Sequence, residues 1–200
     1  VALSQGEIDL NVDQHTAYLE NFNANQDTHL TGITPIPTVP AGLFGGLQND
    51  LQKITKGSII GIPDDPSNTA RALLLLEKAE WITLDESVDP IKATADNIKD
   101  NPYDLDIVQL NSAQIPRSLE DFDYAVIPGS IVYSSGHKAE DSLLSEDVKK
   151  QYELVATVDE KNDDSDWAQA VIDAYHSDDF KEFLDQENTD GYWFIPAELK

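Results

Sequence analysis

The chain has 200 residues, no cysteine, no methionine and a formal net charge of −25, from 38 acidic and 13 basic residues. The charge disfavours nucleic acids and anionic membrane surfaces as partners, because phosphate groups are bound by clustered lysine and arginine. The missing cysteine excludes disulfides, thiolate nucleophiles and zinc–thiolate sites in this segment. No apolar run approaches the ~18–20 residues that a membrane-spanning helix needs.

Strand-like and helix-like segments alternate, which is typical of an α/β fold. In chain order, the pattern predicts a helix over 15–23, strands over 30–34 and 58–62, a helix over 67–79, strands over 106–110, 124–127 and 153–158, and helices over 166–176 and 178–186. The runs at 58–62 and 125–127 are short and continuously apolar, which suits strands buried on both faces of a parallel sheet.

Three segments carry further predictions. The helix over 67–79 is apolar nearly all round and should be deeply buried. The helix over 166–176 has an apolar stripe that includes Trp167 and Tyr175, which we expect in the core. Residues 35–40 contain three prolines, so they predict an extended connector that acts as a hinge or crossover.

The most informative local feature is the end of the strand over 58–62. Asp65 is the expected N-cap of the next helix and Pro66 its first residue. Ligands of α/β folds bind beyond strand carboxyl ends, so first-turn amides near Asn68, together with Arg71, could bind a carboxylate. The alternative is that Asp65 only caps its own helix and Arg71 pairs with a nearby acid. Asp64 favours that alternative, because a second carboxylate repels an anion.

Four stretches, in order along the chain, carry a resemblance to a known family. They are residues 1–9 continuing into 14–19, residues 62–76 with the run PDDPSNTARALLLL, residues 113–121 with AQIPRSLED, and residues 125–127 with AVI. Together they resemble the NlpA/MetQ family of lipoproteins, the methionine-binding subunits of ABC importers. The similarity extends in order over nearly all 200 residues.

The resemblance implies an α/β, two-lobed fold like that of type II periplasmic binding proteins, with the ligand held in the cleft between lobes. Residues 1–56 and 151–200 would form lobe 1, and residues 57–150 would form lobe 2. The family has a strand–helix unit before the segment that matches Val1, and its lipidated cysteine also lies upstream. We therefore expect a chain that is N-terminally truncated relative to the family, with sheet edges of lobe 1 exposed.

The resemblance also assigns ligand contacts to four matching residues. Arg71 would hold the ligand carboxylate, Tyr18 and His15 would line the pocket for the ligand side chain, and Asn68 would belong to the same set. Considered without the resemblance, His15 at a helix start is more typical of a structural hydrogen bond, and Tyr18 of a core aromatic.

Three positions depart from the family pattern. Asp13 replaces a phenylalanine, Pro128 stands where an asparagine follows Ala-Val-Ile, and Leu154 replaces a second asparagine. Those asparagines would hydrogen-bond the ligand, and neither a proline nor a leucine side chain can do so. Asp13 could instead meet a ligand ammonium group, which favours a different amino acid or a short peptide.

The leading hypothesis is a solute-binding protein, not an enzyme, that delivers methionine or a related amino acid to the membrane subunits of an ABC importer. The alternatives are a divergent binder of another amino acid or dipeptide, and a surface or interaction protein that has lost ligand binding. No nucleophile motif, phosphate loop, dinucleotide fingerprint or metal-ligand spacing appears, so no cofactor is predicted. By resemblance, the protein lies on the outer face of the cytoplasmic membrane or the cell surface, held only by an upstream lipid anchor.

Overall fold

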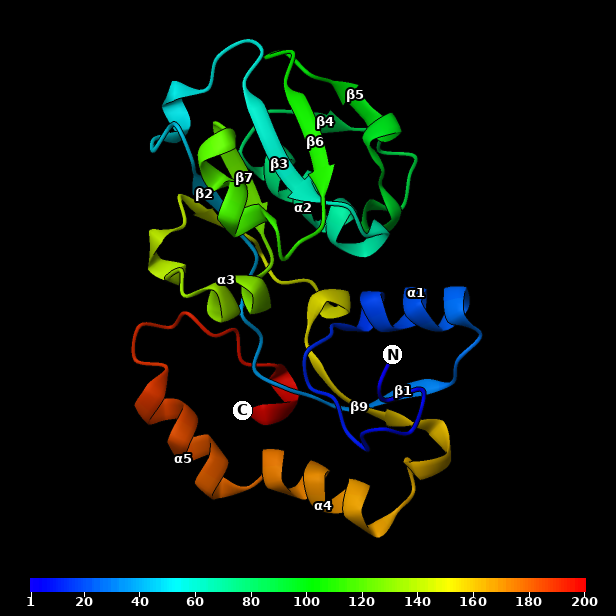
Figure 1. The fold of residues 1–200 in the computed structure, drawn as a ribbon. Coiled ribbons are helices and arrows are strands. Elements are labelled where there is room, and N and C mark those ends of the chain that lie inside the picture. The colour runs from blue at the N-terminus through cyan, green and yellow to red at the C-terminus, as the bar shows by residue number, and fades with distance from the viewer. The chain divides into compact units, whose positions relative to one another are not determined.

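The computed structural model describes residues 1–200, and the chain forms two compact units (Figure 1). Unit 1 holds Val1–Thr38 and Val148–Lys200, and unit 2 holds Val39–Asp147. The chain therefore passes from unit 1 to unit 2 within the proline-rich connector over 35–40, as a crossover should. The first boundary between the units lies after Thr38, whereas the sequence predicted it after residue 56. The reason is that residues 42–45 already form a strand of the unit 2 sheet.

Unit 2 is built on a five-stranded sheet in the order β6-β3-β7-β2-β8. Strand β3 is parallel to β6 and β7, whereas β2 is antiparallel to both β7 and β8. Its strands are β2 (Gly42–Gly45), β3 (Ile59–Pro63), β6 (Asp106–Leu110), β7 (Tyr124–Ile127) and β8 (Leu144–Ser145). The three strands predicted in this region are confirmed and mutually parallel where they pair. The short glycine-bounded β2 and the two-residue β8 carried no strand pattern.

Successive side chains of a strand point to opposite faces of the sheet, so the strands of unit 2 contribute to one hydrophobic cluster on each face. Helix α2 (Pro66–Lys78) covers the first face, and its cluster contains Ile60, Leu73 and Val126, each at most 1% exposed. The second cluster contains Phe44, Phe122 and residues of α3 (Gly129–Ser135) and of the 3-10 helix Ile115–Asp121. All four residues of β7 are buried, as predicted for a strand covered on both sides. A small pair, β4 (Thr83–Leu84) with β5 (Ile98–Asp100), lies apart from this sheet.

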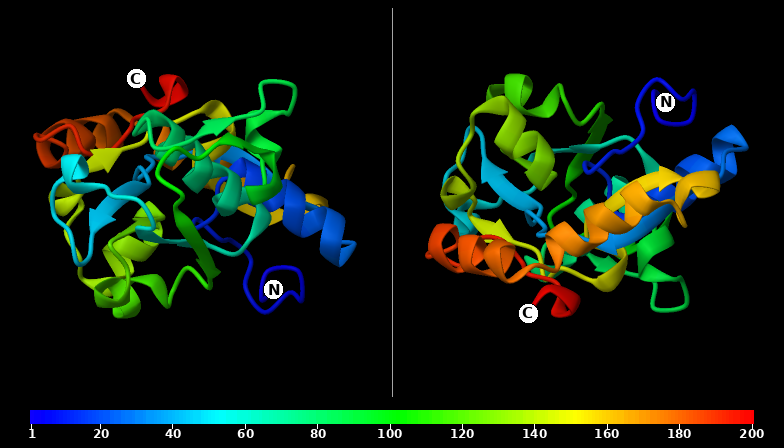
Figure 2. Two further views of the ribbon diagram at one scale, coloured as in Figure 1. Left: turned by 90° about the horizontal axis from the view of Figure 1, so that it is seen from above. Right: turned by 90° about the horizontal axis from the view of Figure 1, so that it is seen from below.

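Unit 1 contains an antiparallel pair of strands, β1 (Leu30–Pro35) and β9 (Val155–Asp159). Helices α1 (Thr16–Gln26) and α4 (Asp166–Tyr175) lie on opposite faces of this pair (Figures 1 and 2). Asn11 makes a single bridge to Thr157 of β9, and His15 makes one to Leu154, just before β9. Helix α5 (Asp178–Glu187) follows α4, and short 3-10 helices join the other elements. No helix in either unit combines the length and apolar character needed to cross a membrane.

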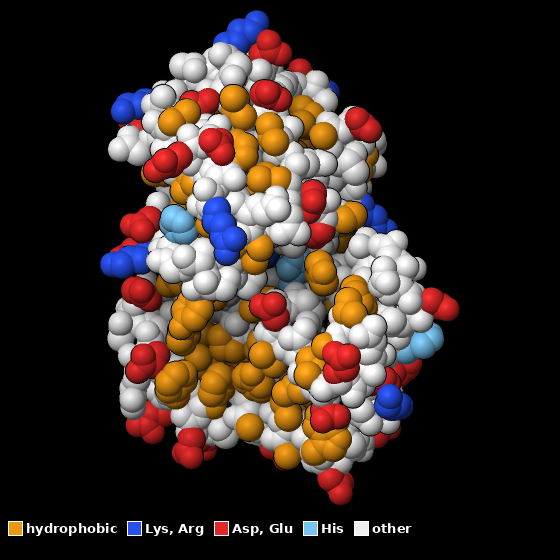
Figure 3. Space-filling view, viewed as in Figure 1, with side chains coloured by type: hydrophobic (Ala, Val, Ile, Leu, Met, Phe, Trp, Pro, Cys, Tyr) orange, Lys and Arg blue, Asp and Glu red, His pale blue; other side chains and the backbone are white.

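The apolar stripe of α4 is less buried than the pattern predicts. Only Ala168 of α4 and Leu184 of α5 are buried, and the side chain of Trp167 is 38% exposed. The expectation of a core Trp167 is therefore wrong, and Tyr175 is only partly buried. Figure 3 shows hydrophobic side chains gathered on the surface of unit 1 near α5 and the C-terminal segment. A helical period marks which face is apolar, but burial depends on what packs against that face.

Candidate functional site

The start of α2 is capped by its own residues. Asp65 is the N-cap and Pro66 the first helical residue, so both predictions are confirmed. The Asp65 Oδ1 atom accepts hydrogen bonds from the Asn68 backbone N at 3.0 Å and from Ser67 Oγ at 2.9 Å. The Asn68 side chain also donates to both Asp65 carboxylate oxygens. The Asn68 amide, which was expected to bind an anion at this helix start, is thus bonded to Asp65, as the capping alternative states.

Arg71 lies one turn further along α2 and pairs with Glu146, which confirms the second part of that alternative. Its Nε donates to Glu146 Oε2 at 2.7 Å, and its Nη2 donates to Oε1. The Arg71 side chain is 4% exposed and that of Glu146 is 7% exposed. Two charge-assisted bonds between buried side chains give this pair the two-bond geometry that arginine and carboxylate groups form best.

The carboxylate of Glu146 is itself fixed by the backbone next to β2. Its Oε1 accepts a hydrogen bond from the Ala41 N at 2.7 Å, and the Glu146 N donates to the Ala41 O at 3.0 Å. Sequence analysis did not select Glu146, because it is 75 positions from Arg71 and is one of many acidic residues. Only the pairing of β2 with β8 brings it to α2.

One edge of the unit 2 sheet collects these groups. Parallel neighbours β3 and β7 end at the same edge, where β3 leads into α2 and β7 leads into Pro128 and α3. Gly42 pairs with both Ile127 and Ser145, which places Ala41 and Glu146 at that edge too. This is the position where open α/β sheets bind ligands. Pro128 is buried there and offers no side-chain cap to α3.

The structure gathers the remaining predicted residues in unit 1. His15 is 3% exposed and is the N-cap of α1, where its Nδ1 accepts a hydrogen bond from the Tyr18 N at 3.1 Å. The His15 ring meets Tyr18 edge-on at 6.3 Å and Tyr152 at 5.3 Å between ring centroids. Leu154 bridges to His15 through the backbone, and Asp13 is exposed. His15 thus has the structural role expected of a helix start, whereas Tyr18 is 40% exposed and is no core aromatic.

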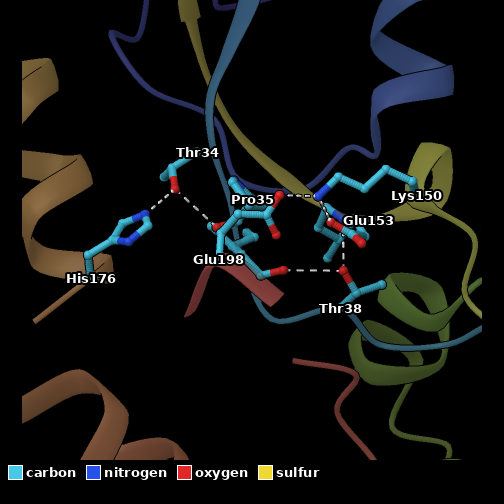
Figure 4. A network of polar contacts seen from close by, with 9 residues as sticks. Thr34, Pro35, Thr38, Lys150, Glu153, His176 and Glu198 are labelled. Atoms are coloured by element: carbon cyan, nitrogen blue, oxygen red, sulfur yellow. Dashed lines mark hydrogen bonds and ion pairs between the residues drawn. The ribbon is translucent and has the colours of Figure 1, made fainter. Parts of the chain in front are cut away.

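A second polar cluster of unit 1 surrounds Lys150, beside a hollow of about 310 Å³ (Figure 4). The Lys150 Nζ donates to Glu153 Oε2 at 2.7 Å and also to Glu198. The hydroxyl of Thr34, which also lines the hollow, contacts His176 Nε2 at 2.9 Å. The Thr34 contact joins the end of α4 to β1, and Lys150 joins Glu198 to Glu153. Sequence analysis singled out none of the three ion-pair residues.

This ion cluster should make stability depend on pH. The hydrogen bond from Lys150 lowers the pKa of Glu198. Burial alone would lower the pKa of Lys150, but its hydrogen bonds to Glu153 and Glu198 outweigh burial and raise that pKa. A lowered carboxyl pKa contributes stability above the unfolded-state value of about 4.3, and this stability is lost as pH falls through the folded-state pKa.

We therefore expect Glu198→Gln to lower the urea midpoint at about pH 7 and to approach the wild type as the pH falls through the lowered pKa of Glu198, since both side chains then become neutral. The difference at neutral pH should shrink in high salt, because the pair is near the surface. Glu7→Gln, at an exposed residue, is the control and should change neither midpoint. Equal losses at both pH values would show that the charge of Glu198 is not the cause.

Comparisons with known proteins place this geometry in a family. The sequence profile of the NlpA lipoprotein family matches residues 1–197. The chain is 32% identical over 184 residues to the D-methionine-binding lipoprotein MetQ of Escherichia coli, covering 90% of this chain and 68% of that relative.

Solved structures agree over almost the whole chain. The structure of a nutrient-binding protein of Burkholderia cenocepacia bound to methionine has a TM-score of 0.87 at 29% identity, covering 97% of this chain and 81% of that one. The substrate-binding protein of a methionine transporter of Streptococcus pneumoniae has a TM-score of 0.85 at 32% identity, covering 98% and 78%. These matches confirm the predicted α/β fold of periplasmic substrate-binding proteins. This chain therefore belongs to the NlpA lipoprotein family.

Proposed function

We propose that this protein is the solute-binding component of an ABC importer and that its ligand is methionine or a closely related amino acid. The observation that carries the proposal is the match, over 97% of the chain, to a protein whose structure contains bound methionine. The sequence relatives named as methionine-binding lipoproteins support the same ligand class. In this role the protein binds and releases its ligand without chemical change, so it is not an enzyme.

Arg71 is the proposed carboxylate-binding residue. Its Nε and Nη2 atoms form the side-on pair with Glu146. A ligand carboxylate would form charge-assisted hydrogen bonds with this guanidinium, whose planar fork matches a carboxylate. In unit 1, His15 and Tyr18 are the proposed contacts of the ligand side chain, with Asn68 of unit 2 as a further proposed contact.

A second candidate ligand, another amino acid or a dipeptide, is favoured by three residues. Pro128 and Leu154 occupy positions where the family resemblance calls for asparagine, and Asp13 is an exposed acid. The backbone N and O of Leu154 are both hydrogen-bonded, to the Thr38 hydroxyl and the Ile36 N. An altered set of ligand donors at these positions would shift the preference away from methionine without changing the fold.

The location and partners follow the same proposal. Because the relatives are named lipoproteins, we propose that a lipid holds the protein at the outer face of the cytoplasmic membrane or at the cell surface. Its partners there are the membrane subunits of an importer. The strongly negative charge, −25 in all, agrees with a small-molecule ligand rather than a nucleic acid.

A thermal-shift screen followed by calorimetry tests the function. The purified protein is heated with each common amino acid, with both enantiomers of methionine and with a small set of dipeptides. A bound ligand stabilises the folded protein and so raises its melting temperature. The stabilisation is about 2.7 kcal/mol when the ligand concentration is a hundred times the Kd. We expect a selective rise with methionine. A selective rise with another zwitterion supports the second candidate ligand. A cooperative melt that no compound shifts would favour a surface protein that has lost ligand binding.

A further inference from the structure

Glu146 shares a buried ion pair with Arg71, the residue proposed to bind the ligand carboxylate. Both side chains are buried, and their formal charges cancel. The next cation along α2, Lys78, is itself neutralised by Asp147 at 2.8 Å and donates to the Ser145 O at 2.9 Å. The arginine proposed to bind the ligand carboxylate therefore sits in a neutral pair rather than in a positively charged pocket.

The pair is also rigid on the Glu146 side. Both carboxylate oxygens accept hydrogen bonds from Arg71, and Oε1 accepts a further one from the Ala41 N. Ala41 and Glu146 additionally exchange a backbone hydrogen bond beside the β2–β8 pair. Three donors on two segments thus hold the Glu146 carboxylate beside Arg71. Its negative charge stays next to any carboxylate that Arg71 binds.

We propose that Glu146 makes the site selective for zwitterions over simple carboxylate anions. A ligand with only a carboxylate adds an uncompensated negative charge beside the neutral Arg71–Glu146 pair, and low local polarity strengthens that penalty. An amino acid adds no net charge. Arg71 thus supplies directional hydrogen bonds, while Glu146 removes the general attraction for anions. This inference rests on the proposed function, and it assigns to Glu146 a role in specificity beyond that of orienting Arg71.

The test compares L-methionine with 4-(methylthio)butanoate, which has the same skeleton without the ammonium group. Calorimetry gives the Kd of each for the wild type, Glu146→Gln and Glu146→Ala. Loosening of Arg71 affects both ligands alike, because both carry the carboxylate, so the ratio of the two Kd values isolates the charge effect. In the wild type, we expect the Kd of 4-(methylthio)butanoate to exceed that of methionine. In both variants, the ratio of these two Kd values should fall by about tenfold or more.

Asp147→Asn is the matched control, since it removes the neighbouring acid, whose side chain is 87% exposed. Its ratio should equal that of the wild type. A wild-type ratio retained in Glu146→Gln and Glu146→Ala, with methionine still bound, would overturn the selectivity proposal alone. A wild type that binds no methionine would contradict the proposed function, and the selectivity proposal would fall with it.

Discussion

Replacing Arg71 by alanine should weaken methionine binding roughly a hundredfold or more, which corresponds to about 3 kcal/mol. The variant loses the two-bond contact to the ligand carboxylate and leaves Glu146 buried, charged and without its guanidinium partner. The measurement is the Kd by calorimetry. Arg117→Ala is the control, because Arg117 is the other arginine of unit 2 and is exposed. Equal affinities for the wild type and Arg71→Ala would exclude Arg71 from the binding site.

The same substitution should cost about 3–5 kcal/mol of unfolding free energy, since breaking one side of a buried pair leaves an uncompensated charge. Arg71→Met with Glu146→Leu separates the two effects. The double variant replaces the pair by apolar groups, so we expect stability close to that of the wild type with binding still lost. Urea unfolding and calorimetry on the three proteins decide this. A double variant as unstable as Arg71→Ala would show that the loss arises from packing rather than from charge.

Replacing Leu73 by alanine should destabilise unit 2 by about 3–5 kcal/mol. Leu73 is fully buried on the face of α2 that packs against the sheet, within the cluster that contains Ile60 and Val126. The surrounding strands are fixed by their pairing and cannot close the cavity that the lost side chain leaves. The measurement is the free energy of unfolding from urea titration.

Leu47→Ala is the matched control, since Leu47 lies in the same unit and is 65% exposed. It should change the unfolding free energy by less than about 0.5 kcal/mol. Similar losses for the two variants would contradict the assignment of the α2 face as the core of unit 2. Leu73 belongs to the core cluster and is not a proposed ligand contact, although it shares α2 with Arg71. Leu73→Ala should therefore retain methionine binding at temperatures where the protein stays folded.

Local chemistry determined much of this structure. The sequence Asp-Pro-Ser-Asn is enough to start α2 at Pro66, because an aspartate cap and a first-turn proline act within four residues. The apolar run over 125–127 is enough to predict a strand buried on both faces. The prolines over 35–40 are enough to exclude a helix there, and this is where the chain changes units. Each of these signals involves neighbouring residues only.

Tertiary structure decided the rest. Glu146 becomes the partner of Arg71 only because β8 pairs with β2 beside α2, and no local pattern distinguishes it from 37 other acids. The first boundary between the units lies at Thr38 because the four-residue β2 belongs to the sheet of unit 2. Composition did not predict β2, since its strand character comes from pairing with β7. The stripe on α4 predicted an apolar face correctly but not the burial of Trp167. Periodicity and capping are local, whereas charge pairing and burial depend on which segments meet in space.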